Sequence, residues 1–434
     1  MNLNKLKKVF IEFCRLLLGI TFVFSGITKA IDPVGGAIKI ADYLVAFKLD
    51  ALKELSLFLS VNLSAFEFTL GVCLLAGVYR LYTAWGVLLT MGFMTPLTLY
   101  LALFNPVSDC GCFGDALVIS NWQTFAKNVV LLAAALVFWR HNQHVARGFS
   151  RRAYWFVPLW GYLFACGFAW HNYQHLPLID FRPYKIGVNI QAERTIPADA
   201  PQDEYRYAFI YEKDGVKKEF GLEEAPTTDS TWTFVESKTE LVKPGYVPPI
   251  HDFVIHTLEG EEVTDQLLEE PRPLLLLIAP HLAEAEDHHI DNINNAYDYS
   301  LEHNIGFYCL TASTEEEIAK WEELTGAEYP YLQADATLLK TMVRANPGMM
   351  LLQEGTILMK WHSSDIPGEE EWPALLSSYS EGNPTAKTQE ERRLLTNILT
   401  FTVPLSLIWL YDLFRHRLQA RKREEQKKAE TEID

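Results

Sequence analysis

The sequence predicts an α-helical membrane protein with six transmembrane helices, four of them in a bundle, and a soluble α/β portion with a small β-rich unit before the last helix. Two observations lead to this fold class. Six apolar runs are long enough to cross a bilayer, which needs roughly 20 residues. Charge is also segregated: residues 1–183 carry 15 Lys+Arg and 9 Asp+Glu, residues 184–391 carry 14 and 40, and residues 392–434 carry 9 and 6. An acidic, water-soluble block therefore lies between two basic, membrane-like blocks.

The six runs cover about 9–31, 57–78, 82–104, 122–140, 153–171 and 395–414. The first run follows three lysines and has no clear small-residue cleavage site, so we expect a retained helix rather than a signal peptide. Because the connection at residues 77–81 is very short, the second and third helices are expected to be antiparallel neighbours. This favours a four-helix bundle over residues 1–145, followed by a fifth helix and an interfacial segment over 146–184.

Basic residues cluster at alternate ends of these runs, which predicts the orientation of the chain. Alternating spans place every cluster in the cytoplasm at once: Lys5, Lys7 and Lys8; Arg80; Arg140, Arg147, Arg151 and Arg152; and Arg415, Arg417, Arg421, Lys422 and Arg423. In a bacterial inner membrane, both termini are then cytoplasmic and residues 185–391 are periplasmic. The basic tail would face anionic membrane lipid. Nothing in this charge pattern indicates nucleic-acid binding.

The first four spans resemble a known membrane family. The features are the Phe24-Ser25-Gly26 stretch of span one, Glu67 among the glycines of span two, and the loop string Cys110-Gly111-Cys112-Phe113-Gly114. Together they resemble the DoxX-like membrane proteins, and within that group the MauE branch associated with methylamine utilisation. The resemblance covers about residues 9–140. It implies a four-helix bundle associated with thiol–disulfide traffic outside the membrane.

The soluble block divides into two parts. Residues 185–246 are expected to form a small β-rich periplasmic unit, with a hairpin over about 205–220. Residues 247–391 alternate strands and helices and resemble the thioredoxin fold in its peroxiredoxin-like form, with Pro347 as its cis proline. The sixth helix and the basic tail follow over 392–434.

This thioredoxin-like domain departs from its redox relatives at one place. After the expected strand Leu274–Ala279, where a redox thioredoxin carries its cysteines, the chain has His281-Leu282-Ala283-Glu284. A helix is expected over about 282–303. Cys309 lies inside an expected strand and is interpreted as a buried apolar residue. The domain is therefore expected to lack thiol chemistry of its own.

Cys110 and Cys112 are the candidate reactive residues. Cys14, Cys73 and Cys166 fall within spans and are expected to pack as small apolar groups. A disulfide between Cys110 and Cys112 is possible because glycine between them lets the backbone turn tightly, and so small a ring should be easily reduced. The alternatives are a structural disulfide, a metal site or inert thiols. Two thiolates are too few for a closed zinc site.

Ionisable residues inside the spans complete the candidate site. Glu67 is expected near mid-membrane, with Lys127 about one turn into span four and Lys29 near the outer end of span one. We expect Glu67 to pair with Lys29 or Lys127, and Lys127 to lower the pKa of one thiol. A purely structural ion pair is the alternative. His281, Glu284 and His288 are spaced i, i+3 and i+7, so one face of the expected helix could bind a metal, but in so acidic a domain we interpret them as a solvated polar face. No metal site is therefore expected.

Three functions remain open. The first is a thiol–disulfide oxidoreductase that exchanges electrons with a periplasmic thiol protein, with a quinone as the candidate cofactor. The second is a scaffold whose cysteine-free domain binds a periplasmic or envelope protein. The third is a carrier or lipid-handling bundle that uses Glu67.

Overall fold

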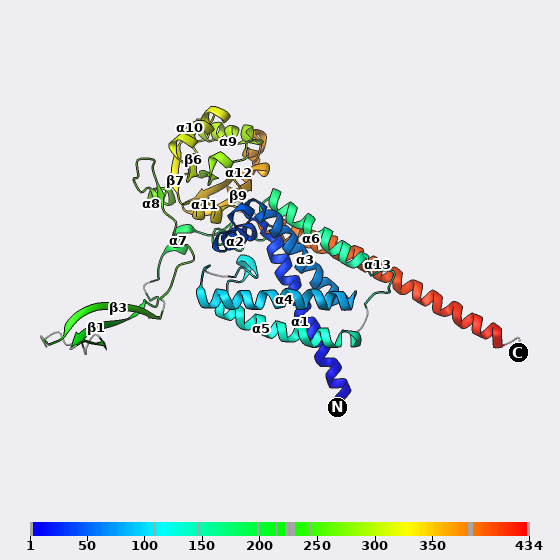
Figure 1. Cartoon of the computed structure of the whole chain (residues 1–434). Helices are drawn as coiled ribbons and strands as arrows, with labels where there is room; N and C mark the ends of the chain where they lie inside the picture. The colour runs from blue at the N-terminus through cyan, green and yellow to red at the C-terminus, as the bar shows by residue number, and fades with distance from the viewer. Residues whose placement is uncertain are drawn as a thin grey trace.

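The structure is a computed structural model that describes residues 3–107, 110–145, 148–197, 199–213, 215–221, 225, 231–243, 245–380 and 385–431. A helical bundle carries a mixed α/β domain at one end, and a separate three-stranded sheet extends from it as an arm (Figure 1). The long helices are α1 (Leu3–Ile31), α3 (Ser56–Ala76), α4 (Arg80–Phe104), α5 (Asn121–His141), α6 (Phe156–Gln174) and α13 (Thr385–Thr431).

The bundle is held by close packing of α1 on α3, α4 on α5, and α3 on α6. A side chain added at Gly26 or Gly71 would collide with the backbone of the facing helix, so these glycines let α1 and α3 approach closely. Leu18, Leu74 and Val87 are buried in the core between the helices. Large apolar side chains point outward along these helices and along α13, as lipid contact requires: Phe13, Ile20, Leu89, Phe93, Leu407 and Leu410.

Five described helical stretches are long and apolar enough to cross a membrane: Lys5–Ile31, Asp50–Ala76, Arg80–Phe104, Asn121–His144 and Arg392–Gln419. The remaining predicted span forms α6, whose apolar character is diluted by Pro158, His171 and Asn172. Its 19 residues nevertheless reach about 28 Å, close to the thickness of a bilayer core.

α6 runs the length of the bundle. Before its start, the amide of Gly148 donates to the carbonyl of Ala76 at the end of α3 (3.0 Å). Near its end, Asn172 Nδ2 donates to the carbonyl of Ala30 at the end of α1 (3.2 Å). Because α1 and α3 are antiparallel, these contacts lie at opposite ends of the bundle. The chain after α6 therefore emerges at the end where α1 terminates.

A short helix that sequence reasoning missed lies at this end. α2 (Pro33–Ala46) follows α1 directly, with Pro33 in its first turn. The Asp32 side chain caps it by accepting a hydrogen bond from the amide of Gly35 (2.7 Å). α2 packs against α3 and is followed by a 3₁₀ helix over Asp50–Leu55.

The arm is a three-stranded antiparallel sheet in the order β2-β1-β3. Its strands are β1 (Glu204–Lys213), β2 (Val216–Gly221) and β3 (Thr233–Lys243). β1 and β2 form the expected hairpin, with Lys213 opposite Val216 at the turn. The preceding short helix α7 (Ile190–Arg194) belongs elsewhere: Ile190 is buried in the core of the α/β domain.

The α/β domain is built on a six-stranded sheet in the order β4-β7-β6-β5-β8-β9. Its strands are β4 (Ile255–His256), β5 (Leu274–Ala279), β6 (Gly306–Thr311), β7 (Tyr331–Ala334), β8 (Gly348–Gln353) and β9 (Thr356–His362). Its helices are α8 (Thr264–Leu268), α9 (Ile290–Glu302), α10 (Glu315–Thr325), α11 (Ala336–Met342) and α12 (Trp372–Ser380).

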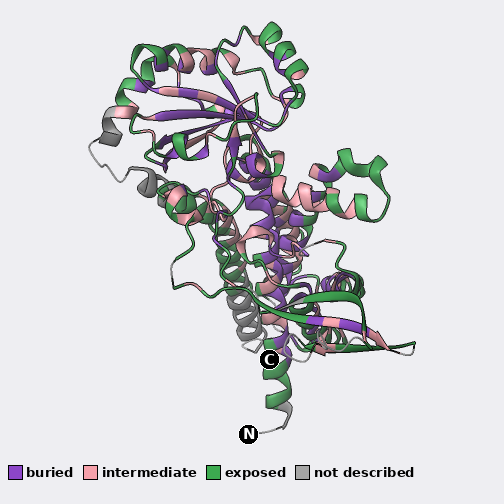
Figure 2. Ribbon diagram, turned by 90° about the vertical axis from the view of Figure 1, so that its left-hand side faces the viewer, coloured by how far each residue is buried: buried purple, intermediate pink, exposed green. Residues whose placement is uncertain are grey.

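β5 is the central strand, parallel to β6 and antiparallel to β8. Its residues alternate between two hydrophobic cores, with Leu276 in one and Leu277 in the other. Every residue of β5 is buried because both faces of the sheet are covered (Figure 2). The Asn346–Pro347 bond before β8 is cis, as expected. The predicted fold class, helical membrane bundle with a thioredoxin-like domain, is confirmed.

The helix expected over 282–303 is wrong in its first half. A 3₁₀ turn covers Leu282–Glu284, and α9 begins only at Ile290. The amide of Glu286 donates to the carbonyl of Asn346 (2.9 Å), which holds the intervening chain against the loop before the cis proline. His281, Glu284 and His288 therefore do not share a helical face. Within the described residues, no group of three or more His, Cys, Asp or Glu side chains is arranged to hold a metal.

Candidate functional site

The loop between α4 and α5 brings the two candidate cysteines together. The Sγ atoms of Cys110 and Cys112 lie 2.8 Å apart, and both thiols are free. Gly111 adopts a left-handed backbone conformation (φ 62°), which lets the chain reverse between them. The thiols are therefore already adjacent, and a short movement would join them.

Two hydrogen bonds hold this loop to the ends of α1 and α2. Ser25 Oγ lies 2.6 Å from the carbonyl oxygen of Cys112, and the Tyr43 hydroxyl lies 2.9 Å from that of Cys110. The ring of Phe113 packs edge-on against Phe24, with centroids 5.3 Å apart. The thiol pair is thus positioned by backbone contacts on both sides of Gly111.

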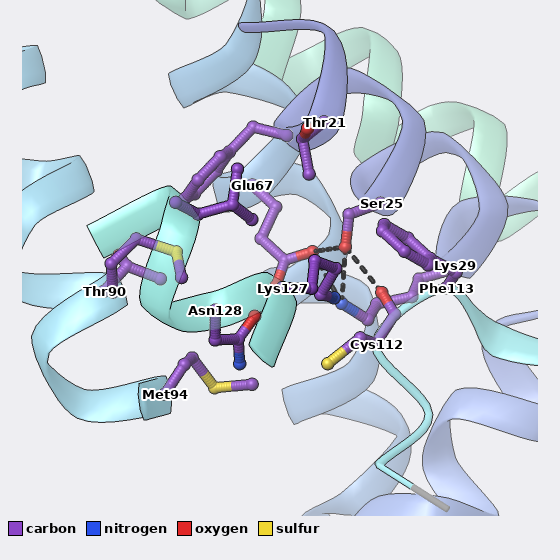
Figure 3. Close-up of a pocket in the computed structure, with 13 residues that line it drawn as sticks. Thr21, Ser25, Lys29, Glu67, Thr90, Met94, Cys112, Phe113, Lys127 and Asn128 are labelled. Atoms are coloured by element: carbon purple, nitrogen blue, oxygen red, sulfur yellow. Dashed lines mark hydrogen bonds and ion pairs between the residues drawn. The ribbon is translucent and has the colours of Figure 1, made fainter. Parts of the chain in front are cut away.

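A buried polar cluster lies directly beneath the loop (Figure 3). Lys29 Nζ and Glu67 Oε2 form an ion pair at 2.6 Å, with both side chains at most 10% exposed. Of the two partners left open for Glu67, the structure therefore pairs it with Lys29. Ser25 Oγ lies 2.7 Å from the same carboxylate oxygen and 3.0 Å from Lys29 Nζ. Because a serine hydroxyl carries one hydrogen, Ser25 can donate to Glu67 or to the Cys112 carbonyl, one at a time.

Lys127 approaches the loop from α5. Its Nζ lies 4.1 Å from the centroid of the Phe113 ring, in a cation–π contact next to Cys112. Lys127 from α5 and Lys29 from the neighbouring α1 therefore both bring positive charge to Cys112, while Glu67 partly offsets it.

The two thiols differ in acidity. A hydrogen bond from the Cys110 thiol is the largest cause that lowers the pKa of Cys112, to about 7. Burial opposes this shift, and the charges of Lys127 and Lys29 add to it. Giving that hydrogen bond raises the pKa of Cys110, and burial raises it further. Cys112 is therefore the thiolate-forming member of the pair, with Cys110 rather than Lys127 as its strongest influence.

A small cavity of about 40 Å³ lies inside the bundle next to these groups. It is lined by Lys29, Glu67, Met94, Cys112, Lys127 and Asn128. A water molecule needs at least about 10–15 Å³ of such space, so the cavity has room for water.

The remaining cysteines lie away from the loop. Cys14 and Cys73 are buried in the helical bundle, and Cys166 is partly buried on α6. Cys309 is fully buried in β6 within the soluble domain, as expected for an apolar residue in a central strand.

The thioredoxin-like domain sits on the same end of the bundle as the thiol loop. Arg344 joins them, with ion pairs of 3.0 Å to Asp32 at the end of α1 and 3.0 Å to Asp115 in the loop. A second cavity, of about 610 Å³, lies between the domain, the first half of α2 and the end of α6. Its lining includes Val34, Ile38, His281, Lys340, Asn346 and His362.

His281, at the position of the missing cysteines, faces this larger cavity. Its Nε2 lies 3.2 Å from Lys340 Nζ, and its carbonyl accepts a hydrogen bond from Asn346 Nδ2 (2.8 Å). The edge of the domain that carries the cis proline is therefore turned toward the bundle and lined with polar side chains.

Sequence reasoning missed Ser25 and the Arg344–Asp115 contact. Ser25 lies four residues before Lys29 on the same face of α1, a spacing that could have linked it to the charged cluster. Arg344 and Asp115 are 229 positions apart, and no local pattern connects them.

Comparisons with known proteins agree with this division. The family model of the methylamine utilisation protein MauE matches residues 7–140. A domain of unknown function, DUF8463, matches residues 205–244, the three-stranded arm. A search among curated proteins finds no match to the chain. The N-terminal part is thus similar to a membrane protein family.

Solved structures with similarity to this chain resemble its soluble part. A putative protein disulfide isomerase from Bacteroides thetaiotaomicron is 19% identical, covering 30% of this chain and 84% of its own, with a TM-score of 0.24. A thioredoxin-like protein from Aeropyrum pernix is 14% identical over 29% of this chain and 89% of its own, with a TM-score of 0.23. The bacterioferritin comigratory protein of Xanthomonas campestris is 9% identical. The match covers 30% of this chain and 91% of that protein's chain, with a TM-score of 0.22.

Proposed function

We propose that this chain is a membrane thiol–disulfide exchange protein whose reactive pair is Cys110 and Cys112. The observation that carries this proposal is the pair of free sulfur atoms 2.8 Å apart, next to two lysines. An inert structural pair would gain nothing from positive charge, whereas a nucleophilic thiolate is stabilised by it. The similarity of the bundle to MauE agrees with this role. We further propose that the bundle is related to the DoxX-like membrane proteins.

In the proposed reaction, the Cys112 thiolate attacks one sulfur of a partner protein's disulfide. A bond forms between Cys112 and that sulfur, and the other partner sulfur leaves as a thiolate. Cys110 then loses its proton to water and attacks the Cys112 sulfur, which releases the second partner thiolate. The pair loses two electrons to the partner and becomes a disulfide. The reverse sequence oxidises a partner dithiol.

The remaining site residues support this chemistry without forming bonds to the partner. Lys127 and Lys29 stabilise the Cys112 thiolate through their charge. Glu67 keeps Lys29 in place through the buried ion pair, and Ser25 connects that ion pair to the loop backbone. Glu67 is thus a positioning residue in this scheme.

We further propose that the reaction takes place on the periplasmic side of a bacterial inner membrane. Both termini are then cytoplasmic. Supporting this orientation, Arg80 lies at the end of the bundle opposite the thiol loop, where its Nη1 donates to the carbonyl of Val145 (2.6 Å). The thioredoxin-like domain lies at the thiol end, so it would be periplasmic as well. An oxidising compartment suits an exchanging thiol pair.

Reaction of the purified full-length protein with the small disulfide DTNB tests this proposal. Attack by Cys112 should release one thionitrobenzoate, and attack by Cys110 should then release a second and leave an intramolecular disulfide. A Cys110→Ser/Cys112→Ser variant measures the background from the four other cysteines. A stable adduct on Cys112 with no second release would contradict exchange.

The larger cavity supports a second candidate, a scaffold whose cysteine-free domain binds a periplasmic or envelope protein. Its 610 Å³ and its mixed lining are suitable for a protruding segment of a partner. If the scaffold hypothesis holds, filling the larger cavity with Ile38→Trp should abolish function in cells, while the double cysteine variant stays functional. A functional Ile38→Trp variant together with an inactive double cysteine variant would favour exchange. The carrier hypothesis gains no support, because Glu67 is paired with Lys29.

A further inference from the structure

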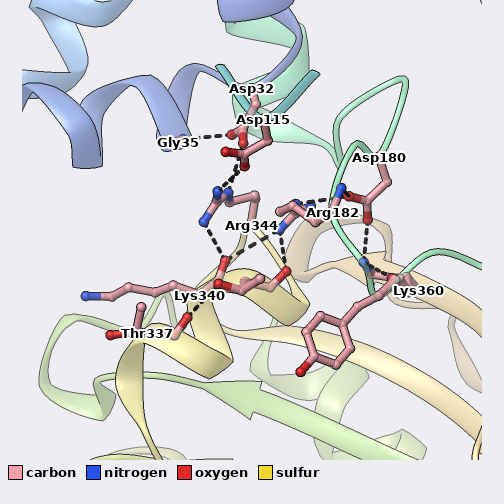
Figure 4. Close-up of polar contacts among 11 residues, drawn as sticks. Asp32, Gly35, Asp115, Asp180, Arg182, Thr337, Lys340, Arg344 and Lys360 are labelled. Carbon is pink, nitrogen blue, oxygen red and sulfur yellow. Dashed lines mark hydrogen bonds and ion pairs between the residues drawn. The ribbon is translucent and has the colours of Figure 1, made fainter. Parts of the chain in front are cut away.

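Arg344 occupies an unusual position between the two halves of the molecule. Its side chain is only 9% exposed, although it lies at an interface between the soluble domain and the bundle. Nε bonds to Asp32 and Nη2 to Asp115, each at 3.0 Å, while Nη1 donates to the carbonyl of Lys340 at 2.7 Å (Figure 4). All three nitrogens of one planar guanidinium are therefore engaged.

The three partners belong to three different parts of the chain. Asp32 terminates α1 and caps α2, so it is fixed to the membrane bundle. Asp115 lies three residues after Cys112, in the 3₁₀ turn Gly114–Ala116 of the thiol loop. Lys340 lies in the last turn of α11 in the thioredoxin-like domain. One side chain thus connects the bundle, the thiol loop and the soluble domain.

Further hydrogen bonds and ion pairs hold the part of the thioredoxin-like domain that carries Arg344. Arg182 donates to the carbonyl of Thr341 (2.9 Å) and pairs with Asp180 (3.0 Å). Asp180 also pairs with the buried Lys360 at 2.7 Å. With Arg344, these groups form a network of three buried cations and three carboxylates, so its charges balance. Such a network holds α11, and therefore Arg344, in one position.

We propose that the thioredoxin-like domain is a clamp for the membrane thiol pair, and that Arg344 is its positioning residue. By holding Asp115, Arg344 keeps Cys112 within the influence of the positive charges of Lys29 and Lys127. The thioredoxin-like domain has no cysteine pair of its own, and the clamp would give it a role at a thiol site. The purpose of the clamp depends on the proposed exchange function, but its effect on Cys112 can be measured without any partner.

Among the described residues, charged and titratable groups reach the thiol loop from four helices and from the loop itself. They are Lys29 from α1, Lys39 and Tyr43 from α2, Glu67 from α3, Lys127 from α5, and Cys110 and Asp115 from the loop. Coulomb attraction falls with distance and with water entry. A loop released from Arg344 would therefore lose part of the lysine stabilisation of its thiolate, and the acidity of Cys112 would move toward that of an ordinary thiol.

The test is the pH dependence of iodoacetamide alkylation at Cys112, resolved by peptide mass spectrometry on the full-length protein. Arg344→Gln and Asp115→Asn should each raise the pH at which Cys112 alkylation reaches half its maximal rate, toward about 8.5. A shift of one unit lowers the alkylation rate at pH 7 by about fivefold. The double variant should shift no further than either single variant, because both changes break the same contact. Arg194→Gln, which breaks an ion pair with the exposed Asp265, is the matched control.

An unchanged midpoint in both single variants would overturn the clamp, as would an equal shift in the Arg194→Gln control. Additive shifts would also overturn it, since they would mean that Arg344 and Asp115 act separately. Asp115→Asn lies outside the soluble domain, so its result stands even where Arg344→Gln unfolds that domain. Failure of DTNB exchange in the wild-type chain concerns the proposed function alone and leaves this measurement intact.

Discussion

Replacing Glu67 with glutamine should destabilise the bundle and at the same time make Cys112 more acidic. The substitution keeps the size of the side chain but removes the charge opposite Lys29. In the wild-type chain the two charged atoms are 2.6 Å apart, with side chains 10% and 7% exposed. At an effective dielectric constant of about 20, two unit charges at this distance attract by about 6 kcal/mol.

Desolvation offsets part of that attraction, so the measured effect is smaller. Removing one member of a buried ion pair costs about 3–5 kcal/mol, because the other charge stays buried without compensation. At roughly 2–4 °C per kcal/mol, Glu67→Gln should lower the melting temperature of the bundle by roughly 10 °C. The negative charge of Glu67 also raises the pKa of Cys112, so its removal should lower the alkylation midpoint of that thiol.

Differential scanning fluorimetry in detergent and alkylation of Cys112 measure the two effects on one sample. Lys29→Met should be similarly destabilising but should raise the Cys112 midpoint, and the Lys29→Met/Glu67→Gln double variant should recover most of the lost stability. Glu316→Gln, which breaks a fully exposed ion pair with Lys320, is the control and should change neither quantity. A Glu67→Gln protein as stable as the wild type, or a double variant as unstable as the singles, would mean that the Lys29–Glu67 ion pair does not stabilise the bundle.

Three further predictions concern the thiol loop. Cys110→Ala should raise the alkylation midpoint of Cys112 well above about 7, because the thiolate loses its strongest hydrogen bond; an unchanged pH profile would remove Cys110 from that role. Lys127→Met should raise the same midpoint by less, and a shift larger than that of Cys110→Ala would reverse the order of the two influences. Gly111→Ala should slow disulfide closure after DTNB attack, since a side chain at φ 62° is strained; closure at the wild-type rate would show that the loop relaxes freely.

The sequence contained much of the fold because membrane spans and buried strands follow from composition. Five of the six predicted spans form long apolar helices, and β5 is buried throughout, as its run of leucines indicates. The fifth predicted span, α6, is not among the helices that are apolar enough to cross a membrane by composition, and contacts at its two ends place it along the length of the bundle. α2 was missed, although Asp32 and Pro33 together are typical of a helix start.

The candidate site was predictable as a set of residues but not as an arrangement. Lys29 and Lys127 lie at similar depths in the bundle, so sequence alone could not decide which one pairs with Glu67. The break between Leu282 and Ile290 depends on a backbone hydrogen bond to Asn346, about 60 residues later. Tertiary contacts of this kind leave no periodic pattern, and the same holds for the Arg344–Asp115 contact.

Thiol–disulfide exchange at Cys112 is tested most directly by trapping the mixed disulfide. In Cys110→Ser, Cys112 can attack a partner but cannot be resolved, so cells that express this full-length variant should accumulate a reductant-sensitive adduct on Cys112 with a defined periplasmic protein. The adduct should be absent from the Cys110→Ser/Cys112→Ser variant, which should also lose function. No adduct on Cys112, together with full function of the double variant, would contradict thiol–disulfide exchange at this loop.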